Sequence, residues 1–452
     1  MKRIFRSLKT VNYRLWFALL LILLLPTIYQ TVRINFLGDM PNDWGFNIAS
    51  QLQWLNLFYE VIQEALILPI FFIMGKYVNN REELSSKVRS GLLITGLVYS
   101  GLSMLVIIFA EPLVVFMAQD TSLLEATITY IRLETVAALF STLVKFLMIV
   151  FITIKQDKKM YVLLAVQMVL SIILDTFLIS ALPISIKMGV NGIAVTNIIV
   201  NIILLVTSVL LLLKEKIFIF SREKFEFAWM KEWFHVGKYS GLESLLRNAA
   251  FMIMIVRMVN LVAEQGNYWV ANNFIWGWLL LPGLALADLV KQETAANENN
   301  IRTKTLGYIT LTVIFSIVWL LSIPLWKPFL QYVMNVTDYD TVFYIALIQT
   351  GFYLTFLFNS CIFDATFYGR GKTKYMLIQS LFIDALYYGV MFILYLTGIF
   401  VPTLTSIALM FGIGMTLDFI PTMIIYIFML KKQNIKIDFS LTENTQTIEE
   451  SV

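Results

Sequence analysis

Long apolar stretches separated by short polar loops constrain this chain more than any other feature of its sequence. A helix needs about 20 mostly apolar residues to cross the ~30 Å hydrocarbon core of a bilayer. Twelve stretches reach that length: residues 15–38, 48–74, 90–117, 122–154, 161–183, 191–213, 234–262, 268–290, 305–331, 341–368, 375–400 and 404–430. Hydrophobic residues make up 59% of the 452 residues and charged residues 14%, so a soluble globular domain is excluded. We predict an all-α polytopic membrane protein with twelve transmembrane helices.

The lysines and arginines predict the orientation of these spans, because cytoplasmic loops carry an excess of them. The N-terminus and the loops after even-numbered spans hold nearly all of them, for example Lys158 after span 4 and Arg370 after span 10. The loops after odd-numbered spans contain only Lys187 and Lys327. We therefore expect both termini on the cytoplasmic side of a cell inner membrane.

An internal repeat divides the chain into two halves. Residues 130–164 align without gaps on residues 344–378, and the shared residues include Lys158/Lys372 and Tyr161/Tyr375 in corresponding loops. Each half has six spans and starts inside, so the repeats are parallel and related by an axis along the membrane normal. We predict an N-terminal six-helix lobe (1–213), a cytoplasmic linker (214–233), a C-terminal six-helix lobe (234–433) and a polar cytoplasmic tail (434–452). Two such bundles around a central cleft suit alternating access.

Ionisable residues at bilayer depth are costly and normally face a cavity or a partner. The acidic residues within or near the spans are Glu60, Glu64, Glu134, Asp175, Glu243, Asp288, Asp364, Asp384 and Asp418. The basic ones are Arg33, Arg132, Lys145, Arg247 and Arg257. Buried carboxylates such as Glu243 and Asp364 can bind a proton or Na⁺ and attract a cationic substrate. Two alternatives remain open: Arg247, four residues after Glu243, neutralises it locally, and Asp288, Asp384 and Asp418 hold structural hydrogen bonds.

Other functions find little support in the sequence. A net charge of +4 is too small to indicate nucleic-acid binding. The sequence contains no HExxH, Walker A or GxSxG motif, and it has a single histidine and a single cysteine. We expect no enzymatic activity, no bound metal and no cofactor other than a coupling ion, with membrane lipids and a small organic substrate as the partners of a monomer.

Several segments resemble the multidrug and toxic compound extrusion (MATE) family, of the superfamily that also holds lipid-linked oligosaccharide flippases. They are IMGKYVNNREELSSKVRSG (73–91), EPLVVFMAQDTSLLEATITYIRLETV (111–136), SIILDTFLI (171–179) and MGVNGIAVTN (188–197). The resemblance covers essentially the whole chain in length and order. It implies a V-shaped, two-lobed secondary antiporter that exports organic molecules against Na⁺ or H⁺.

The resemblance also assigns roles to residues. Glu243 in SGLESLL and Asp364 in FDATFYGRGKTK look like the family's acidic residues for cation coupling in the C-terminal lobe. Asp175 matches the aspartate of the family's pattern in the N-terminal lobe, but Arg33 stands where the family often has another aspartate. Thr196 matches a polar position near that site, and Pro26 matches a span 1 proline that can act as a hinge. Arg33 would repel a cation beside Asp175, or serve as a tethered counter-ion for it.

Three functions follow from these features. The first is an antiporter that exports amphipathic, cationic organic compounds in exchange for H⁺ or Na⁺, with Glu243, Asp364 and Asp175 coupling the cation. The second is a flippase or exporter of an anionic lipid-linked or peptide-like substrate. The third is a transport-inactive scaffold or receptor. The candidate residues of the substrate cleft are Arg33, Glu60, Glu64, Arg132, Lys145, Thr196, Arg247 and Arg257. If the arginines converge on one cleft, the anionic function is favoured.

Overall fold

The computed structural model describes residues 2–40, 44–75, 77, 80–154, 156–220 and 225–437. Most of the predicted polar tail, from residue 438 on, and the loop residues Lys155, Arg222 and Lys224 lie outside this range. The helices of the first half are α1 (Lys2–Lys9), α2 (Tyr13–Leu37), α3 (Trp44–Ala49), α4 (Leu52–Gly75), α5 (Arg81–Ile108), α6 (Ala110–Phe116), α7 (Leu124–Thr153), α8 (Asp157–Leu178) and α9 (Val190–Lys214).

Several helices of the second half are interrupted or extended by π-helical turns. Its α-helices are α10 (Met230–Phe251), α11 (Arg257–Leu261), α12 (Gln265–Phe274), α13 (Leu281–Ala296), α14 (Asn299–Pro328), α15 (Tyr339–Phe358), α16 (Ala365–Gly369), α17 (Thr373–Ile383), α18 (Gly389–Leu396) and α19 (Leu404–Lys432). The π-helical turns are η3 (Met252–Val256), η4 (Ile275–Leu279), η5 (Phe329–Val333), η6 (Asn359–Asp364) and η7 (Asp384–Tyr388).

Each of the twelve predicted spans falls on a helix or on a run of consecutive helical segments. Within the described residues, nine helices are long and apolar enough to cross a membrane. The number rises to ten if the segments Gln265–Leu279 and Leu281–Ala296, which are bent by 57° relative to each other, are counted together as one span. Pro282 lies in the first turn of α13, where the missing N–H and the proline ring favour such a bend. The other two predicted spans fall on α4 and on α10–α11.

The predicted span at 90–117 is wrong at both ends. The helix begins at Arg81, where the Asn80 side chain accepts hydrogen bonds from the backbone N–H groups of Glu82 and Glu83. Asn80 therefore caps the helix in the polar loop, ten residues before the apolar run becomes continuous. The helix ends at Ile108, and residues 110–116 form the separate short helix α6.

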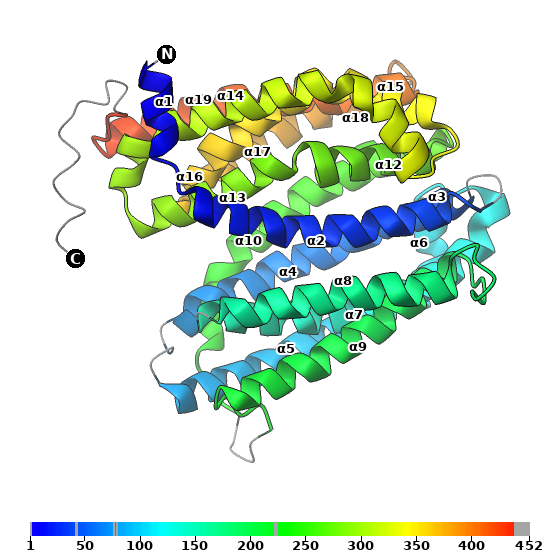
Figure 1. The fold of residues 1–452 in the computed structure, drawn as a ribbon, viewed down its shortest axis with the longest axis horizontal. Coiled ribbons are helices and arrows are strands. Elements are labelled where there is room, and N and C mark those ends of the chain that lie inside the picture. Colours follow the sequence, from blue (N-terminus) through cyan, green and yellow to red (C-terminus); the bar gives the residue numbers. More distant parts are fainter. Residues whose placement is uncertain are drawn as a thin grey trace.

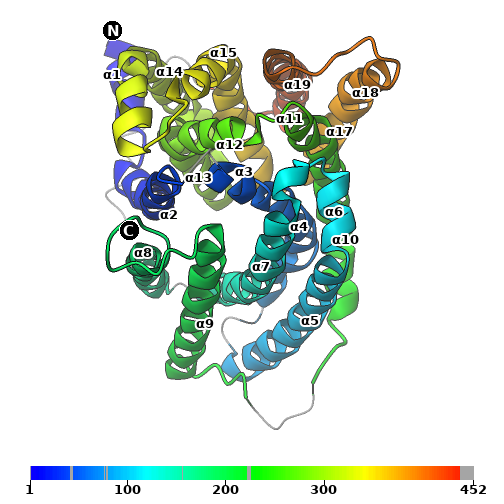
Figure 2. The same ribbon diagram turned by 90° about the vertical axis from the view of Figure 1, so that its right-hand side faces the viewer.

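The helices form two lobes that meet along a central set of helices (Figure 1). One lobe contains α5, α7, α8 and α9, and the other contains α14, α15, α17, α18 and α19, with α2, α4, α10 and α13 between them. The contacts agree with this arrangement, since α2 packs on both α8 and α13, and α4 packs on both α7 and α10. Figure 2, turned by 90°, shows the two lobes from the side of α3, α6 and α12.

The two ends of the molecule differ in charge. The helix α1, the α9–α10 connection and the end of α19 lie at one end, and α3 and α6 lie at the other (Figure 1). We call the first the basic end, because it holds α1 with Arg6 and Lys9, Lys214 at the end of α9, and Lys431 and Lys432 at the end of α19. The opposite end, which includes the connection containing Lys187 and the last turn of α14 with Lys327, is called the far end.

The linker between the lobes is attached to the N-terminal lobe. Trp229 and Trp233 are buried and stacked, with ring centroids 4.8 Å apart. The Trp229 indole N–H donates to Ser90 Oγ of α5 at 3.2 Å. Lys87 of α5 pairs with Glu226 at 2.5 Å, and this ammonium holds the pKa of the Glu226 carboxyl below its ordinary value. The described end of the linker therefore follows the N-terminal lobe.

Candidate functional site

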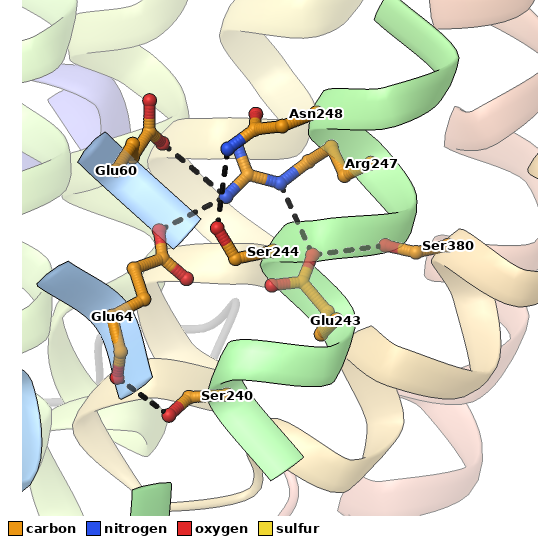
Figure 3. A network of polar contacts seen from close by, with 8 residues as sticks. All are labelled: Glu60, Glu64, Ser240, Glu243, Ser244, Arg247, Asn248 and Ser380. Atoms are coloured by element: carbon orange, nitrogen blue, oxygen red, sulfur yellow. Dashed lines mark hydrogen bonds and ion pairs between the residues drawn. The ribbon is translucent and has the colours of Figure 1, made fainter. Parts of the chain in front are cut away.

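Three carboxylates from the two lobes surround the guanidinium of Arg247 (Figure 3). Glu243 lies one turn before Arg247 on α10, and its Oε1 accepts from Arg247 Nε at 3.1 Å. From α4, Glu64 Oε1 lies 3.0 Å and Glu60 Oε1 lies 3.5 Å from Arg247 Nη2. The local pair expected from the four-residue spacing is thus confirmed. The same arginine also links the two lobes.

A close approach of α4 and α10 makes this contact. Gly237 and Gly241 form a GxxxG pattern on α10, of the kind that lets membrane helices pack backbone to backbone. A Cβ on Gly237 would lie 1.9 Å from the carbonyl oxygen of Ala65, and one on Gly241 would lie 2.6 Å from the Ala65 Cβ. Between them, Ser240 Oγ donates to the backbone carbonyl of Glu64 at 2.8 Å (Figure 3). The glycines therefore set the helix spacing at the charge cluster.

The cluster is accessible and carries excess negative charge. The side chains of Arg247 and Glu60 are 43% and 39% exposed, whereas those of Glu64 and Glu243 are 14% and 12% exposed. One arginine faces three carboxylates, so the ionised set carries a net charge of −2. Lys145 of α7 donates to the side-chain carbonyl of Gln63 at 3.1 Å, and among the described residues it has no ion pair with a carboxylate. This arrangement can hold a positively charged group between the lobes.

A second acidic group lies in the C-terminal lobe. Asp418 of α19 accepts from Gln379 Nε2 at 2.7 Å and from Asn359 Nδ2 at 3.0 Å. Asp364 Oδ1 and Asp384 Oδ2 are buried without a hydrogen-bond partner among the described residues. Asp364 ends η6 and Asp384 begins η7. Such π-helical turns are frequent at functional sites, because the extra residue breaks the regular hydrogen bonding of the helix.

The helix α17 connects the two acidic groups. Ser380 Oγ donates to Glu243 Oε1 at 3.2 Å, as Figure 3 shows, and the preceding residue Gln379 donates to Asp418. A change at Asp418 can therefore reach Glu243 through two adjacent residues of a single helix. Gln379, Ser380 and Asn359 were not among the expected site residues. The sequence signal that could have identified them is that they are polar residues within apolar stretches.

The N-terminal lobe holds a buried, paired set of charges. Arg33 of α2 binds Asp175 of α8 through two hydrogen bonds, Nε to Oδ2 at 2.8 Å and Nη2 to Oδ1 at 3.4 Å. The two residues are 5% and 1% exposed. The alternative that Arg33 serves as a tethered counter-ion is therefore confirmed. Nearby, Glu134 of α7 accepts from the Asn197 amide at 2.9 Å. The adjacent residue Thr196 is buried, and its hydroxyl finds no hydrogen-bond partner in the described part of the chain.

The remaining candidates lie apart from these groups. Arg132 is exposed and donates to the carbonyl of Ile107. Arg257 donates to the carbonyl of Phe116 at 2.7 Å and lies over the ring of that residue. Pro26 lies within α2, which continues through it as one helix. The arginines therefore do not converge on one cleft, and each of the five membrane-depth cations already has an acceptor.

Buried amides join the two lobes at the far end. Gln51, between α3 and α4, exchanges hydrogen bonds with Asn260 of α11, with Nε2 to Oδ1 at 3.0 Å and Nδ2 to Oε1 at 3.1 Å. Gln119 Oε1 accepts from both Gln51 Nε2 and Gln265 Nε2 at 3.3 Å. Asn260 also donates to the carbonyl of Met117 at 2.6 Å. We call Gln51, Gln119, Asn260 and Gln265 the amide network; it was not anticipated from the sequence.

Solved transporter structures share this fold. An inward-facing conformation of a multidrug resistance MATE family transporter of the MOP superfamily aligns over 90% of this chain and 95% of its own, with a TM-score of 0.72 and 15% identity. An outward-facing conformation of such a transporter aligns over 93% and 96%, with a TM-score of 0.63 and 16% identity.

A MOP superfamily transporter from Pyrococcus furiosus, described as having a binding pocket of reverse polarity that suggests a different function, aligns over 96% and 99% with a TM-score of 0.65 and 16% identity. No protein-family model and no curated protein sequence matches the chain. The chain has the fold of the MATE transporters, which confirms the fold class expected from the sequence.

Proposed function

We propose that this chain, built on the MATE fold, is a secondary active transporter that exports amphipathic organic cations in exchange for H⁺ or Na⁺. The observation that carries the proposal is the convergence of Glu60, Glu64 and Glu243 on Arg247 between the lobes. The excess negative charge attracts a cation, and the partial exposure of Glu60 and Arg247 allows one to reach it. The basic end faces the cytoplasm, where the substrate enters.

Arg247 acts in this proposal as an internal competitor of the substrate. It is held to Glu243 on its own helix and reaches Glu60 and Glu64 across the interface. A cationic substrate that binds Glu64 displaces the guanidinium and so breaks a link between the lobes. A ligand shifts a conformational equilibrium only by its different affinity for the two states, and this exchange of partners supplies such a difference.

The coupling ion acts at the neighbouring acidic group. Asp364 and Asp384 each present a buried oxygen that has no hydrogen-bond partner within the described ranges, and Asp418 is held by two amides. Protonation of, or Na⁺ binding to, these carboxylates lowers the negative charge behind Glu243. The hydrogen bonds of Gln379 and Ser380 transmit this change along α17. Asp175, the third predicted coupling residue, is occupied by Arg33 and has no such role in the proposal.

An anionic substrate is the second candidate, because Arg33 inverts the charge of an N-lobe position and a relative of similar fold is described with reverse pocket polarity. The pairing of Arg33 with Asp175 leaves this guanidinium compensated. The cationic substrate is therefore the better supported proposal.

The test is export of a fluorescent organic cation from energised cells, with the proton and sodium gradients collapsed separately. We expect Glu64→Gln and Asp364→Asn to lower export about tenfold or more, since each removes a charged partner worth roughly 1.5–3 kcal/mol. Glu125→Gln, which changes an exposed carboxylate in the first turn of α7, is the matched control and keeps wild-type export. A well-expressed wild type that exports anionic and no cationic compounds overturns the proposal.

A further inference from the structure

A pocket lies at the far end of the N-terminal lobe, apart from the charge cluster around Arg247. A pocket of about 420 Å³ opens between the end of α2, the helix α3 and the connection from α8 to α9. This volume is in the range of small-molecule sites, roughly 300–1,000 Å³. Its apolar lining comes from Phe36, Met40, Trp44, Ile48, Ile179 and Val190. The pocket lies one turn beyond the Arg33–Asp175 pair on the same two helices and far from Arg247 in the chain.

The surroundings of the pocket are suited to lipid and not to water. In the α8–α9 connection, Leu182, Ile184, Ile186 and Met188 are 48%, 60%, 67% and 38% exposed. Phe177 at the end of α8 is 47% exposed, so the apolar surface of that helix continues into the connection. Exposed apolar side chains in a loop are unfavourable in water but stable at the boundary of a bilayer. Trp44 is half exposed at the rim, as interfacial tryptophans commonly are.

The rim carries a lysine that is free to bind an anion. Lys187 lines the pocket, and within the described part of the chain its ammonium makes no hydrogen bond or ion pair. Its backbone has φ +52°, a conformation that few residues other than glycine adopt. The other far-end lysine, Lys327, differs, because it pairs with Asp340 at 2.5 Å and lies over the ring of Phe343. The acidic rim residue Asp39 is held by the Asn335 amide at 2.8 Å.

We propose that this pocket binds one acyl chain of an anionic phospholipid, with the phosphate at Lys187. The lipid comes from the leaflet at the far end, which is the outer leaflet in the orientation of the proposed function. The apolar pocket accepts the chain, the exposed α8–α9 connection places the site at headgroup depth, and the ammonium supplies the charge. Asn335 joins this rim to the C-terminal lobe, since it also donates to the carbonyl of Asn35 at 3.0 Å. The lipid therefore supports the contact between the lobes at this point.

The experiment measures tryptophan quenching by brominated lipids in vesicles that contain the purified full chain. The chain has ten tryptophans, so the contribution of Trp44 is the difference between the wild type and Trp44→Phe. Vesicles of phosphatidylcholine with increasing brominated phosphatidylglycerol are compared with vesicles in which the phosphatidylcholine carries the bromine. We expect quenching of Trp44 to reach half of its maximum at a mole fraction of brominated phosphatidylglycerol about fivefold lower than that of brominated phosphatidylcholine. This ratio corresponds to the roughly 1 kcal/mol that one lysine contributes to the binding of an anionic lipid.

Lys187→Gln removes this preference, whereas Lys327→Gln, which changes the same charge at the same end, keeps it. Ala181→Phe, at an exposed position that lines the pocket, lowers Trp44 quenching by both lipids. Equal behaviour of the two lysine variants, or full quenching in Ala181→Phe, overturns the proposal. Cation export by the same variants is measured in parallel, so that a failure of the lipid site is distinguished from a failure of the transport function.

Discussion

Two arginines of this chain neutralise carboxylates in different ways. Arg33 makes a buried, two-bond pair with Asp175, whereas Arg247 is partly exposed and shared among three carboxylates. Removal of one member of a buried ion pair leaves the charge of the other member uncompensated. An exposed arginine that is shared among several carboxylates can exchange partners at a lower cost in free energy. We therefore assign a structural role to Arg33 and a functional role to Arg247.

Loss of Arg33 should destabilise the protein. We expect Arg33→Gln to lower the free energy of unfolding by about 3–5 kcal/mol, because Asp175 stays buried without its partner. The double variant Arg33→Leu/Asp175→Leu should recover most of this loss. Thermal denaturation in detergent measures both, with Arg132→Gln as the control, since that exposed guanidinium donates to the backbone carbonyl of Ile107. A single variant as stable as the wild type would contradict the structural role.

The sequence predicts the contacts within a helix better than those between helices. The four-residue spacing of Glu243 and Arg247 was sufficient to expect their ion pair. No local pattern could show that Glu60 and Glu64 reach the same arginine, because this depends on how α4 crosses α10. The structural hydrogen bonds expected for Asp418 are present, with Gln379 and Asn359. Asp384 instead keeps a buried oxygen to which no described residue donates a hydrogen bond.

Among the helices, the pair α4–α10 determines the site. The GxxxG pattern of Gly237 and Gly241 brings these helices together at Ala65, and their charged residues meet as a result. Glycine lowers the stability of a helix by roughly 0.5–1 kcal/mol relative to alanine. Here that cost is offset by close packing, which no larger residue permits.

Gly241→Leu should separate the two helices. We expect a loss of about 1–3 kcal/mol from overpacking and a loss of cation export, since Arg247 no longer reaches Glu64. The control is Gly101→Ala on α5, where an added Cβ meets no atom within 4 Å. Measurement of thermal stability and export in both variants tests the role of the pair. Wild-type export in Gly241→Leu would show that the contact is dispensable.

The π-helical turns break the internal repeat. Residues 130–164 lie on α7 and the start of α8, which are regular helices, whereas residues 344–378 include the π-helical turn η6 before α17. The alignment places Asp364 opposite Val150, so the departure from symmetry coincides with a carboxylate. The repeat predicts the shared architecture of the lobes but not this difference, because π-helical turns leave no clear periodic signal in a sequence.

For the whole molecule, the amide network closes the far end of the lobe interface. Its four side chains are at most 5% exposed. A buried amide that loses its partner costs about 1–3 kcal/mol. Opening of the far end breaks several of these bonds, and water then replaces them. The network therefore favours the state in which the far end is closed.

A cross-link through the network should stop transport. We expect Gln51→Cys/Asn260→Cys, joined by a short bifunctional thiol reagent with a reducible link, to lose export and to regain it after reduction. The only native cysteine, Cys361, is buried and gives little background. Each single cysteine variant, treated in the same way, is the control. Export that persists in the cross-linked protein would show that the far end need not open.

Most of the architecture was predictable because the hydropathy of each stretch can be read directly from the local sequence. The twelve apolar stretches correspond to the observed helical runs, and the main errors are the ends of the third span and the bend before Pro282. The contacts that join the lobes were not predictable. They depend on the amide network and on α2, whose two packing faces have no distinct signature in a uniformly apolar stretch.

The position of α2 has a consequence for how the chain is made. This helix packs on α8 of its own lobe and on α13 of the other, and α13 begins at Leu281, about 240 residues after α2 ends. Ribosomes add roughly 5–20 residues per second, so α2 waits some 12–50 s for its second neighbour. During that interval one face of α2 is covered by lipid, or by whatever assists membrane insertion, and the final step of assembly is the replacement of that cover by α13.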